Sequence, residues 1–295
     1  MKFILTADWH VRADAPIGRR DSYFETLRYK INQITTLAND HDATILIAGD
    51  IFHRHNPTPQ EISCTIQALS NNNVLVVAGN HDLPFHNYGN LERSGLYTAL
   101  VGGAFSLIQH NRHAMRRKVY VYGKNWNEPL HKKQHARSLL THAQHPEFKI
   151  LLAHEYVWKK TKPFPDAPDD CKARTVMEKY KQFDLIVTGD NHQSFTQHDG
   201  DRYLINPGSI MRSARDQIKF KPRVAIFDTN APHDFEWAYL NIAHDVWVKQ
   251  DTANPIAPRI KNPIGELDFN KNLEQEFDRR NTDKETKTKV QEMVP

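Results

Sequence analysis

Residues 46–53 read LIAGDIFH, an apolar run that ends in glycine and aspartate with a histidine three residues later. Similar runs ending in an acid, an amide or a histidine occur in LTADWH (5–10), VVAGNHD (76–82) and VTGDNHQSF (187–195). Short aliphatic runs of this kind are typical of strands that are buried on both faces of a sheet. Because ligands bind at the carboxyl ends of the strands in an open α/β sheet, we expect these polar side chains to converge there.

Apolar runs alternate with helix-like stretches along the chain. The runs are FILTAD, TILIAGD, NVLVVAGN, KVYVYG, FKILLAHE, FDLIVTGD, RYLINPG and RVAIFD. Residues 21–40 have helical apolar spacing after an acidic N-cap, and residues 58–72 start with a threonine cap followed by proline. Shorter helices are expected at 132–144 and 172–182. This alternation predicts an α/β protein built in layers.

The composition favours a cytoplasmic protein with one large domain. The chain has 295 residues and a mean hydropathy of −0.67, which suits a single sizeable core under a charged surface. No apolar run approaches the ~20 residues that span a bilayer, and the N-terminus lacks the cleavage site of a signal peptide. The two cysteines form neither a disulfide framework nor a metal motif.

The C-terminal part of the sequence has a different character. We expect a catalytic domain over residues 1–245 and an extension over residues 246–295. The extension begins with a proline-containing stretch, has one short amphipathic helix at 266–281, and ends in a charged tail.

Ten polar residues follow the expected strands and could form a metal site. They are Asp8, His10, Asp50, His53, Asn80, His81, Asp82, His154, Asp190 and His192. Carboxylate, imidazole and amide groups suit Mn, Mg, Fe or Zn, and two such ions can clamp a phosphate for in-line attack. Any one of these residues alone is better explained as a helix cap or as a hydrogen-bonded core histidine than as a metal ligand. Their occurrence as an ordered set favours the metal site.

The ordered motifs resemble those of the calcineurin-like metallophosphoesterases over roughly residues 1–230. The motifs are D-x-H at 8–10, G-D-x-x-H at 49–53, G-N-H-D at 79–82, a histidine at 154 and G-x-x-H at 189–192. GDIFHRHNP and NPGSIMR further resemble the SbcD-type DNA-repair nucleases, with a phage-encoded enzyme suiting the short tail. The resemblance implies a four-layer α-β-β-α sandwich, with two mixed sheets flanked by helices.

The resemblance also implies a role for each side chain. The first metal would be held by Asp8, His10 and His192 and the second by Asn80, His154 and Asp190, with Asp50 bridging both. His81 would protonate the leaving oxygen, Asp82 would orient His81, and His53 would lie near the scissile phosphate. We expect two divalent ions, Mn first, with Mg, Fe and Zn as alternatives.

Asp190 departs from the family pattern, which usually has G-H-x-H where this chain has Gly189-Asp190-Asn191-His192. Aspartate still offers an oxygen ligand, and its charge should favour the harder ions Mn and Mg over Zn. The competing interpretation is a damaged second metal site.

The substrate is less determined than the chemistry. A net charge of +4 and lysines beside aromatics in YVWKKTKPF (156–164) favour a polyanion such as DNA, with Trp158, Lys159, Lys160 and Arg212 as candidate contacts. A solvated charged loop explains that segment equally well. The alternatives to a DNA nuclease are a small-substrate phosphatase or cyclic-nucleotide phosphodiesterase, and a weakly active subunit that binds DNA or an SbcC-type ATPase. A homodimer is left open, and no membrane partner is expected.

Overall fold

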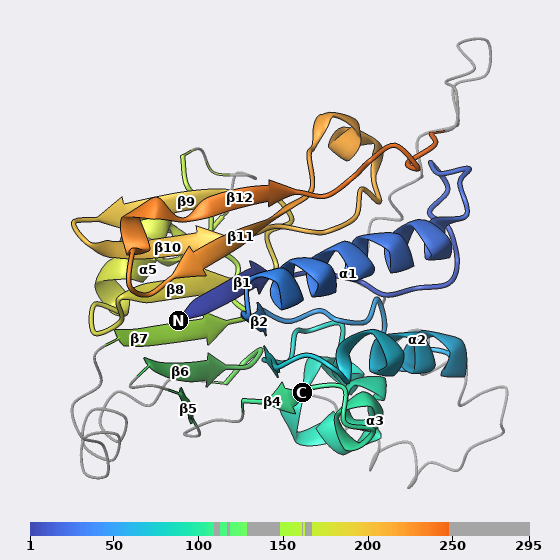
Figure 1. Ribbon diagram of the computed structural model, residues 1–295, viewed down its shortest axis with the longest axis horizontal. Helices are drawn as coiled ribbons and strands as arrows, with labels where there is room; N and C mark the ends of the chain where they lie inside the picture. The colour runs from blue at the N-terminus through green and yellow to red at the C-terminus, as the bar shows by residue number, and fades with distance from the viewer. Residues whose placement is uncertain (109–112, 117–118, 129–147, 161, 163–166, 248–295) are drawn as a thin grey trace, which may run out of the picture. The chain divides into compact units, whose positions relative to one another are not determined.

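The computed structural model describes residues 1–108, 113–116, 119–128, 148–160, 162 and 167–247 (Figure 1). Within them the chain forms two six-stranded mixed sheets. The first has the order β12 (Glu236–Tyr239), β11 (Arg223–Asp228), β1 (Lys2–Thr6), β2 (Thr44–Ile47), β3 (Val74–Val76) and β4 (Ser106–Leu107). The second has the order β5 (His113–Arg116), β6 (Val119–Lys124), β7 (Phe148–Ala153), β8 (Leu185–Thr188), β10 (Arg202–Asn206) and β9 (Phe195–Asp199).

Helices cover the outer face of each sheet. The α-helices are α1 (Tyr23–Asp40), α2 (Pro59–Leu69), α3 (Gly95–Val101) and α5 (Ala173–Lys179). Short 3₁₀ helices are η1 (Pro84–His86), η2 (Tyr88–Arg93), η3 (Asp169–Cys171), η4 (Arg215–Lys219) and η5 (Pro232–Asp234). In Figure 1, α1, α2 and α3 lie on the side of the first sheet and α5 lies on the side of the second. The expected four-layer α-β-β-α arrangement is confirmed.

Three apolar clusters fill the spaces between the four layers. One packs α1 and α2 against the first sheet, through side chains such as Leu27 and Ile45. The second lies between the sheets, where Leu46 of β2 and Leu152 of β7 are both buried, and the third packs Val176 of α5 on the second sheet. Alternate residues of the buried strands therefore face different layers, which explains why these strands read as nearly continuous apolar runs.

All eight expected strands are present, and four others have no clear sequence signal. β4 is only two residues long, and β9 carries the polar sequence FTQHD. The other two, β5 and β12, pair at sheet edges, where one neighbouring strand suffices and apolar runs are not required.

The N-terminus of α2 is as expected, whereas that of α1 is not. Thr58 caps α2, accepting from the Glu61 amide at 3.3 Å, while the Glu61 carboxylate accepts from the Thr58 amide at 2.6 Å. The expected acidic cap of α1 is wrong, because Ser22 is the N-cap residue. Asp21 instead accepts from the Arg19 guanidinium at 2.6 Å, a stronger, charge-assisted bond.

Several expectations fall outside the described residues. The helix expected at 132–144, the helix at 266–281 and nearly all of the extension at 246–295 are among them. The helix expected at 172–182 is confirmed as α5. Within the described part of the chain, the helices are all too short or too polar to cross a bilayer.

Candidate metal centre

Four residues at the ends of three strands adopt left-handed backbone conformations. Their φ angles are 51° at Asp8, 46° at His10, 52° at Asp50 and 70° at Asp190. Non-glycine residues seldom adopt positive φ, and such strain concentrates at functional sites. The turns after β1, β2 and β8 therefore hold these side chains in conformations that ordinary loops avoid.

The strand ends bring together three groups of potential metal ligands among the described residues. The groups are Asp8–His10–His192, Asp8–Asp50–His154 and His10–His53–His81, each with its ligand atoms within 4.8 Å of one another. The first two groups share Asp8, and the carboxylate of Asp50 lies 3.7 Å from His10 and 3.6 Å from His154. This is the arrangement that a pair of neighbouring cations requires.

Asp8 is fully buried and only half satisfied. Its Oδ1 accepts from the Asp190 amide at 2.9 Å, whereas its Oδ2 has no hydrogen-bond partner. Burial raises the pKa of Asp8 well above its ordinary value, and the nearby carboxylate of Asp50 raises it further. A buried carboxylate oxygen without a donor is costly unless a cation binds it.

His154 and Asn80 provide a second fit to a cation. His154 is buried, and its Nδ1–H donates to the carbonyl of Ala48 at 2.7 Å, which leaves a lone pair on Nε2. That Nε2 lies 3.0 Å from Oδ1 of Asn80, which is also an acceptor. Two acceptors facing each other at this distance repel unless a positive charge lies beside both.

His10 and His192 form the other side of the centre. Their Nε2 atoms are 3.0 Å apart, and Nδ1 of buried His10 has no partner. Burial lowers the pKa of His10 well below its ordinary value, and the neighbouring His192 lowers it further. A neutral imidazole is the form that binds a metal.

Two glycines are required by the close approach of ligand side chains. A Cβ at Gly49, whose φ is +85°, would lie 2.3 Å from Nδ1 of His154. A Cβ at Gly79 would lie 2.0 Å from Oδ1 of Asp50. The glycines of the G-D-x-x-H and G-N-H-D motifs therefore make room for the ligands themselves.

Asp190 contacts the centre through its backbone amide rather than through its carboxylate. Its amide donates to Asp8, but its carboxylate belongs to none of the three ligand groups formed by the described residues. It faces Tyr156, whose pKa is raised by burial and then by the charge of Asp190. Its role as a ligand of the second metal stays a prediction.

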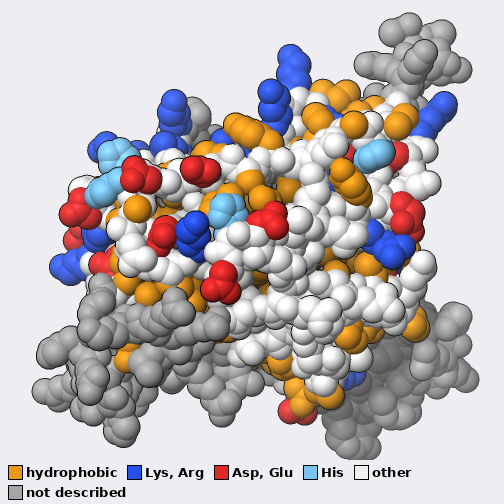
Figure 2. All heavy atoms as spheres, viewed as in Figure 1, with side chains coloured by type: hydrophobic (Ala, Val, Ile, Leu, Met, Phe, Trp, Pro, Cys, Tyr) orange, Lys and Arg blue, Asp and Glu red, His pale blue; other side chains and the backbone are white. Residues whose placement is uncertain are grey.

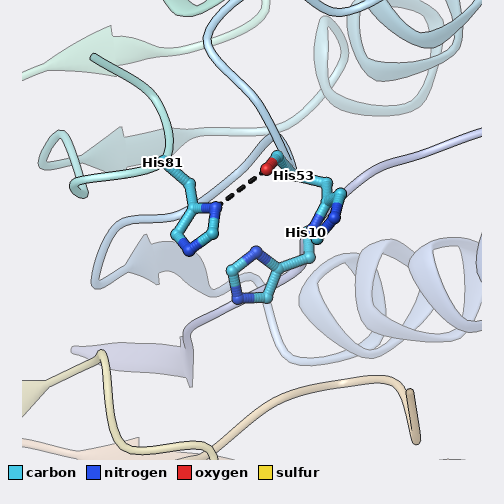
Figure 3. Close-up of side chains that lie close together, drawn as sticks. All are labelled: His10, His53 and His81. Atoms are coloured by element: carbon cyan, nitrogen blue, oxygen red, sulfur yellow. Dashed lines mark hydrogen bonds between the residues drawn. The ribbon is translucent and has the colours of Figure 1, made fainter. Parts of the chain in front are cut away.

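His53 and His81 lie beside the centre with His10 (Figure 3). The rings of His53 and His81 stack with centroids 5.6 Å apart, and Nδ1 of His81 donates to the carbonyl of His53 at 2.8 Å. The expectation that Asp82 orients the His81 ring is wrong. Asp82 is buried and accepts from three backbone amides, those of Ile51, Phe52 and Gly79. It fixes the turn after β2, and a backbone carbonyl orients His81.

Arg12 is a residue beside the centre that sequence reasoning missed. Its Nη1 lies 3.0 Å from Nε2 of His53, and its Nη2 pairs with Asp14. Burial and the charge of Arg12 lower the pKa of His53 to about 4. The side chain of Arg12 is 16% exposed, and its guanidinium connects His53 to the exposed Asp14. Arg12, two residues after His10 of the D-x-H motif, was the available signal.

Two of the expected substrate contacts are buried away from substrate. Arg212 donates to Asp245 at 2.7 Å and to the carbonyl of Ile218, so its guanidinium is used inside the protein. Trp158 is 4% exposed and donates to the carbonyl of Pro168. Neither can contact phosphate or stack on a base in this structure, because their polar atoms and ring faces are already covered.

The other two expected contacts, Lys159 and Lys160, are exposed. Lys159 donates to the carbonyl of Thr196 at the start of β9.

The NPGSIMR turn supports the loop that carries His192. The side chain of Asn206 donates to the carbonyl of Asn191 at 3.0 Å, and the amide of Ser209 donates to the carbonyl of His192 at 3.1 Å. Asn191 in turn donates to Val157 in the loop after β7. The turn therefore positions the loop after β8.

The chain belongs to the calcineurin-like phosphoesterase family, whose family model matches residues 1–194. Membership of this family implies a phosphoester hydrolase. The metal-binding chemistry of the family agrees with the ligand groups found at the strand ends. The family model shows the family but not the SbcD-type branch within it, so membership of that branch stays a prediction. No curated protein matched the chain.

Solved structures are similar to this chain at low sequence identity. A putative 5'-nucleotidase from Staphylococcus aureus, in complex with alpha-ketoglutarate, is 12% identical with a TM-score of 0.50, over 86% of this chain and 55% of that one. An archaeal phosphodiesterase is 14% identical with a TM-score of 0.44, over 81% of this chain and 100% of that one. Phosphopantetheinyl hydrolase from Mycobacterium tuberculosis is 14% identical with a TM-score of 0.46, over 87% and 98%.

Proposed function

We propose that this chain is a metal-dependent phosphodiesterase that cleaves DNA, as an exonuclease or endonuclease in repair or replication. The observation that carries the proposal is the pair of ligand groups that share Asp8, with His81 beside them. The pair suits two cations, and the histidine lies where a leaving group can be protonated.

The residues fit two divalent ions. One would be held by Asp8, His10 and His192 and the other by Asn80 and His154, with Asp50 shared and Asp190 completing the second. Bound there, the ions supply positive charge for the phosphoryl group and activate water for in-line attack. Oxygen and imidazole ligands and the absence of thiolate favour Mn, with Mg, Fe and Zn as alternatives.

His81 is the proposed acid for the leaving oxygen. Since its Nδ1–H donates to the carbonyl of His53, His81 would act as the acid in its imidazolium form, in which Nε2 carries the second ring proton and releases it to the leaving oxygen. The ring is 4.8 Å from that of His10, centroid to centroid, and thus lies at the edge of the metal centre. Arg12, held beside His53, would contact a non-bridging phosphate oxygen and neutralise its charge.

The choice of DNA rests on the resemblance of GDIFHRHNP and NPGSIMR to SbcD-type nucleases and on the mildly basic chain. An SbcC-type ATPase partner would need a docking segment, and the only candidate, residues 266–281, lies outside the described residues. The ATPase partner is therefore a weaker proposal than the nuclease.

The test is one substrate panel with Mn, Mg, Zn or chelator. It contains bis-p-nitrophenyl phosphate, p-nitrophenyl phosphate, cyclic AMP, and single- and double-stranded DNA. We expect Mn-dependent turnover of the aryl diester and of DNA. Intact DNA together with rapid turnover of the monoester or of cyclic AMP would reject the nuclease in favour of a small-substrate enzyme. No turnover of any substrate with any metal would favour a binding subunit.

A further inference from the structure

The start of β11 and the end of β12 lie beside the carboxyl end of β1, where the metal centre is. β11 runs antiparallel to β1 with Leu5 opposite Ala225, so Arg223 lies near the end of β1 that leads to Asp8. β12 is antiparallel to β11, and Tyr239 lies opposite Arg223. β11 and β12 therefore place the cation of Arg223 and the ring of Tyr239 at the strand ends where the metal ligands converge.

Arg223 connects this edge to the loop of His192. Its Nε donates to Oγ of Ser194 at 2.8 Å, two residues after His192. Its guanidinium lies over the ring of Trp237, 3.8 Å from the centroid, and its Nη1 is 3.4 Å from the hydroxyl of Tyr239. Arg223, Trp237 and Tyr239 thus form a continuous stack that begins beside a proposed metal ligand.

The outer part of this stack is exposed and basic. Tyr239 is 59% exposed, and Lys219 and Lys221, just before β11, are exposed as well. Figure 2 shows Lys and Arg side chains standing beside hydrophobic ones over η4, which ends at Lys219. Glu236, the acid of β12, is on the opposite face of the strand from Trp237 and Tyr239 because side chains alternate.

We propose that Lys219, Lys221, Arg223, Trp237 and Tyr239, here called the β11–β12 surface, bind a single-stranded nucleic acid and lead it to the metal centre. This inference rests on the proposed phosphodiesterase function and names its substrate path. Lysines and arginine follow a phosphate backbone, and an exposed aromatic ring stacks on an unpaired base. The bases of a duplex are stacked on each other and do not offer their faces, so the exposed ring favours a single strand.

This surface replaces the base-stacking site that the sequence suggested at Trp158. That tryptophan is buried, whereas Tyr239 is exposed and lies in a strand that the sequence did not predict. In KFKPR (219–223) every second residue is a cation: Lys219, Lys221 and Arg223.

The test measures binding of fluorescein-labelled dT20 by fluorescence anisotropy, with chelator present so that no cleavage occurs. The double variant K219Q/K221Q should weaken binding and lower the slope of log K against log salt by about 1.4, since each phosphate contact on a single strand contributes ~0.7. Tyr239→Ala should weaken binding about tenfold or more. The matched control K181Q/R28Q changes exposed residues of the α5 region and α1 and should bind like the wild type.

Inorganic polyphosphate, used as an unlabelled competitor, separates stacking from charge alone. Tyr239→Ala should keep its wild-type affinity for polyphosphate while losing affinity for dT20. Equal loss for both polymers, or wild-type affinity for dT20 in both test variants, would overturn the proposal. Melting temperatures measured on all variants show that each is folded. Failure of the wild type to hydrolyse bis-p-nitrophenyl phosphate with Mn would reject the proposed function separately, because the binding assay contains no active metal.

Discussion

Nε2 of His154 and Oδ1 of Asn80 face each other at 3.0 Å, and the only ring proton of a neutral His154 is already donated to Ala48. Both atoms are therefore acceptors, and with the unpartnered Oδ2 of Asp8 they make the protein alone electrostatically strained at this point. One divalent cation bound by Asp8 and another bound by Asn80 and His154 would together remove the strain at all three atoms.

The first prediction follows from that strain. Mn at about 100 times its dissociation constant should raise the melting temperature by at least ~5 °C, since ligand binding to the folded state alone stabilises it by about 2.7 kcal/mol per site. Differential scanning fluorimetry with and without chelator measures this. In Asn80→Ala with His154→Ala the increase should be about halved. An equal increase in the double variant would mean that these two residues hold no metal.

The second prediction concerns His81. His81→Ala should retain both metals and lose activity by about 10²–10⁴-fold, the usual contribution of a general acid. Steady-state rates on bis-p-nitrophenyl phosphate and metal content by mass spectrometry measure the two effects. His198→Ala is a suitable control, because His198 is exposed, lies in β9 and belongs to none of the three ligand groups. Unchanged turnover in His81→Ala would refute the acid assignment.

The third prediction concerns the aspartate at position 190. Asp190→His should shift the metal preference towards Zn, because imidazole is a softer ligand than carboxylate and carries no charge. Dialysis against equimolar Mn and Zn, followed by metal analysis, gives the ratio directly. The same ratio in variant and wild type would show that Asp190 is not a ligand.

The fourth prediction separates two arginines. Arg12→Gln should raise KM for the aryl diester with little change in stability, because this side chain reaches His53 beside the centre and its ionic partner Asp14 is exposed. Arg212→Gln should instead lower the free energy of unfolding by about 1–3 kcal/mol, since it removes the charge-assisted hydrogen bonds that Arg212 contributes to a buried ion cluster. That cluster joins Arg19, Lys30 and Arg212 to Asp245. Urea titration of both variants measures the free energy of unfolding, and Michaelis–Menten kinetics measures KM. A raised KM with normal stability for Arg212→Gln would restore it as a phosphate contact.

The sequence predicted those structural features that depend on residues close together in the chain. Aliphatic runs identified the buried strands, and Thr58 followed by Pro59 identified the start of α2, because each reflects contacts within a few residues. The polar residues at strand ends were found because the sheet topology gathers them.

Long-range partners could not be predicted from the sequence. Arg212 resembles a phosphate contact until Asp245, thirty-three residues away, is seen beside it. Asp82 follows His81 in sequence, yet its hydrogen-bond partners are amides of the turn after β2. Trp158 lies in a basic segment, but its ring is buried and the ammonium of Lys172 lies over it. Tyr239 lies in an edge strand that has no apolar run. In each case the role of the residue depends on tertiary packing, which the sequence pattern does not show.

The central claim is that this phosphoesterase works with a pair of cations at the strand ends. The most direct measurement is the Mn stoichiometry of recovered activity in metal-stripped protein, followed by hydrolysis of bis-p-nitrophenyl phosphate. We predict no turnover in chelator and recovery that reaches its plateau at two equivalents of Mn per chain. Full turnover in chelator, or a plateau at one equivalent, would contradict the two-cation centre.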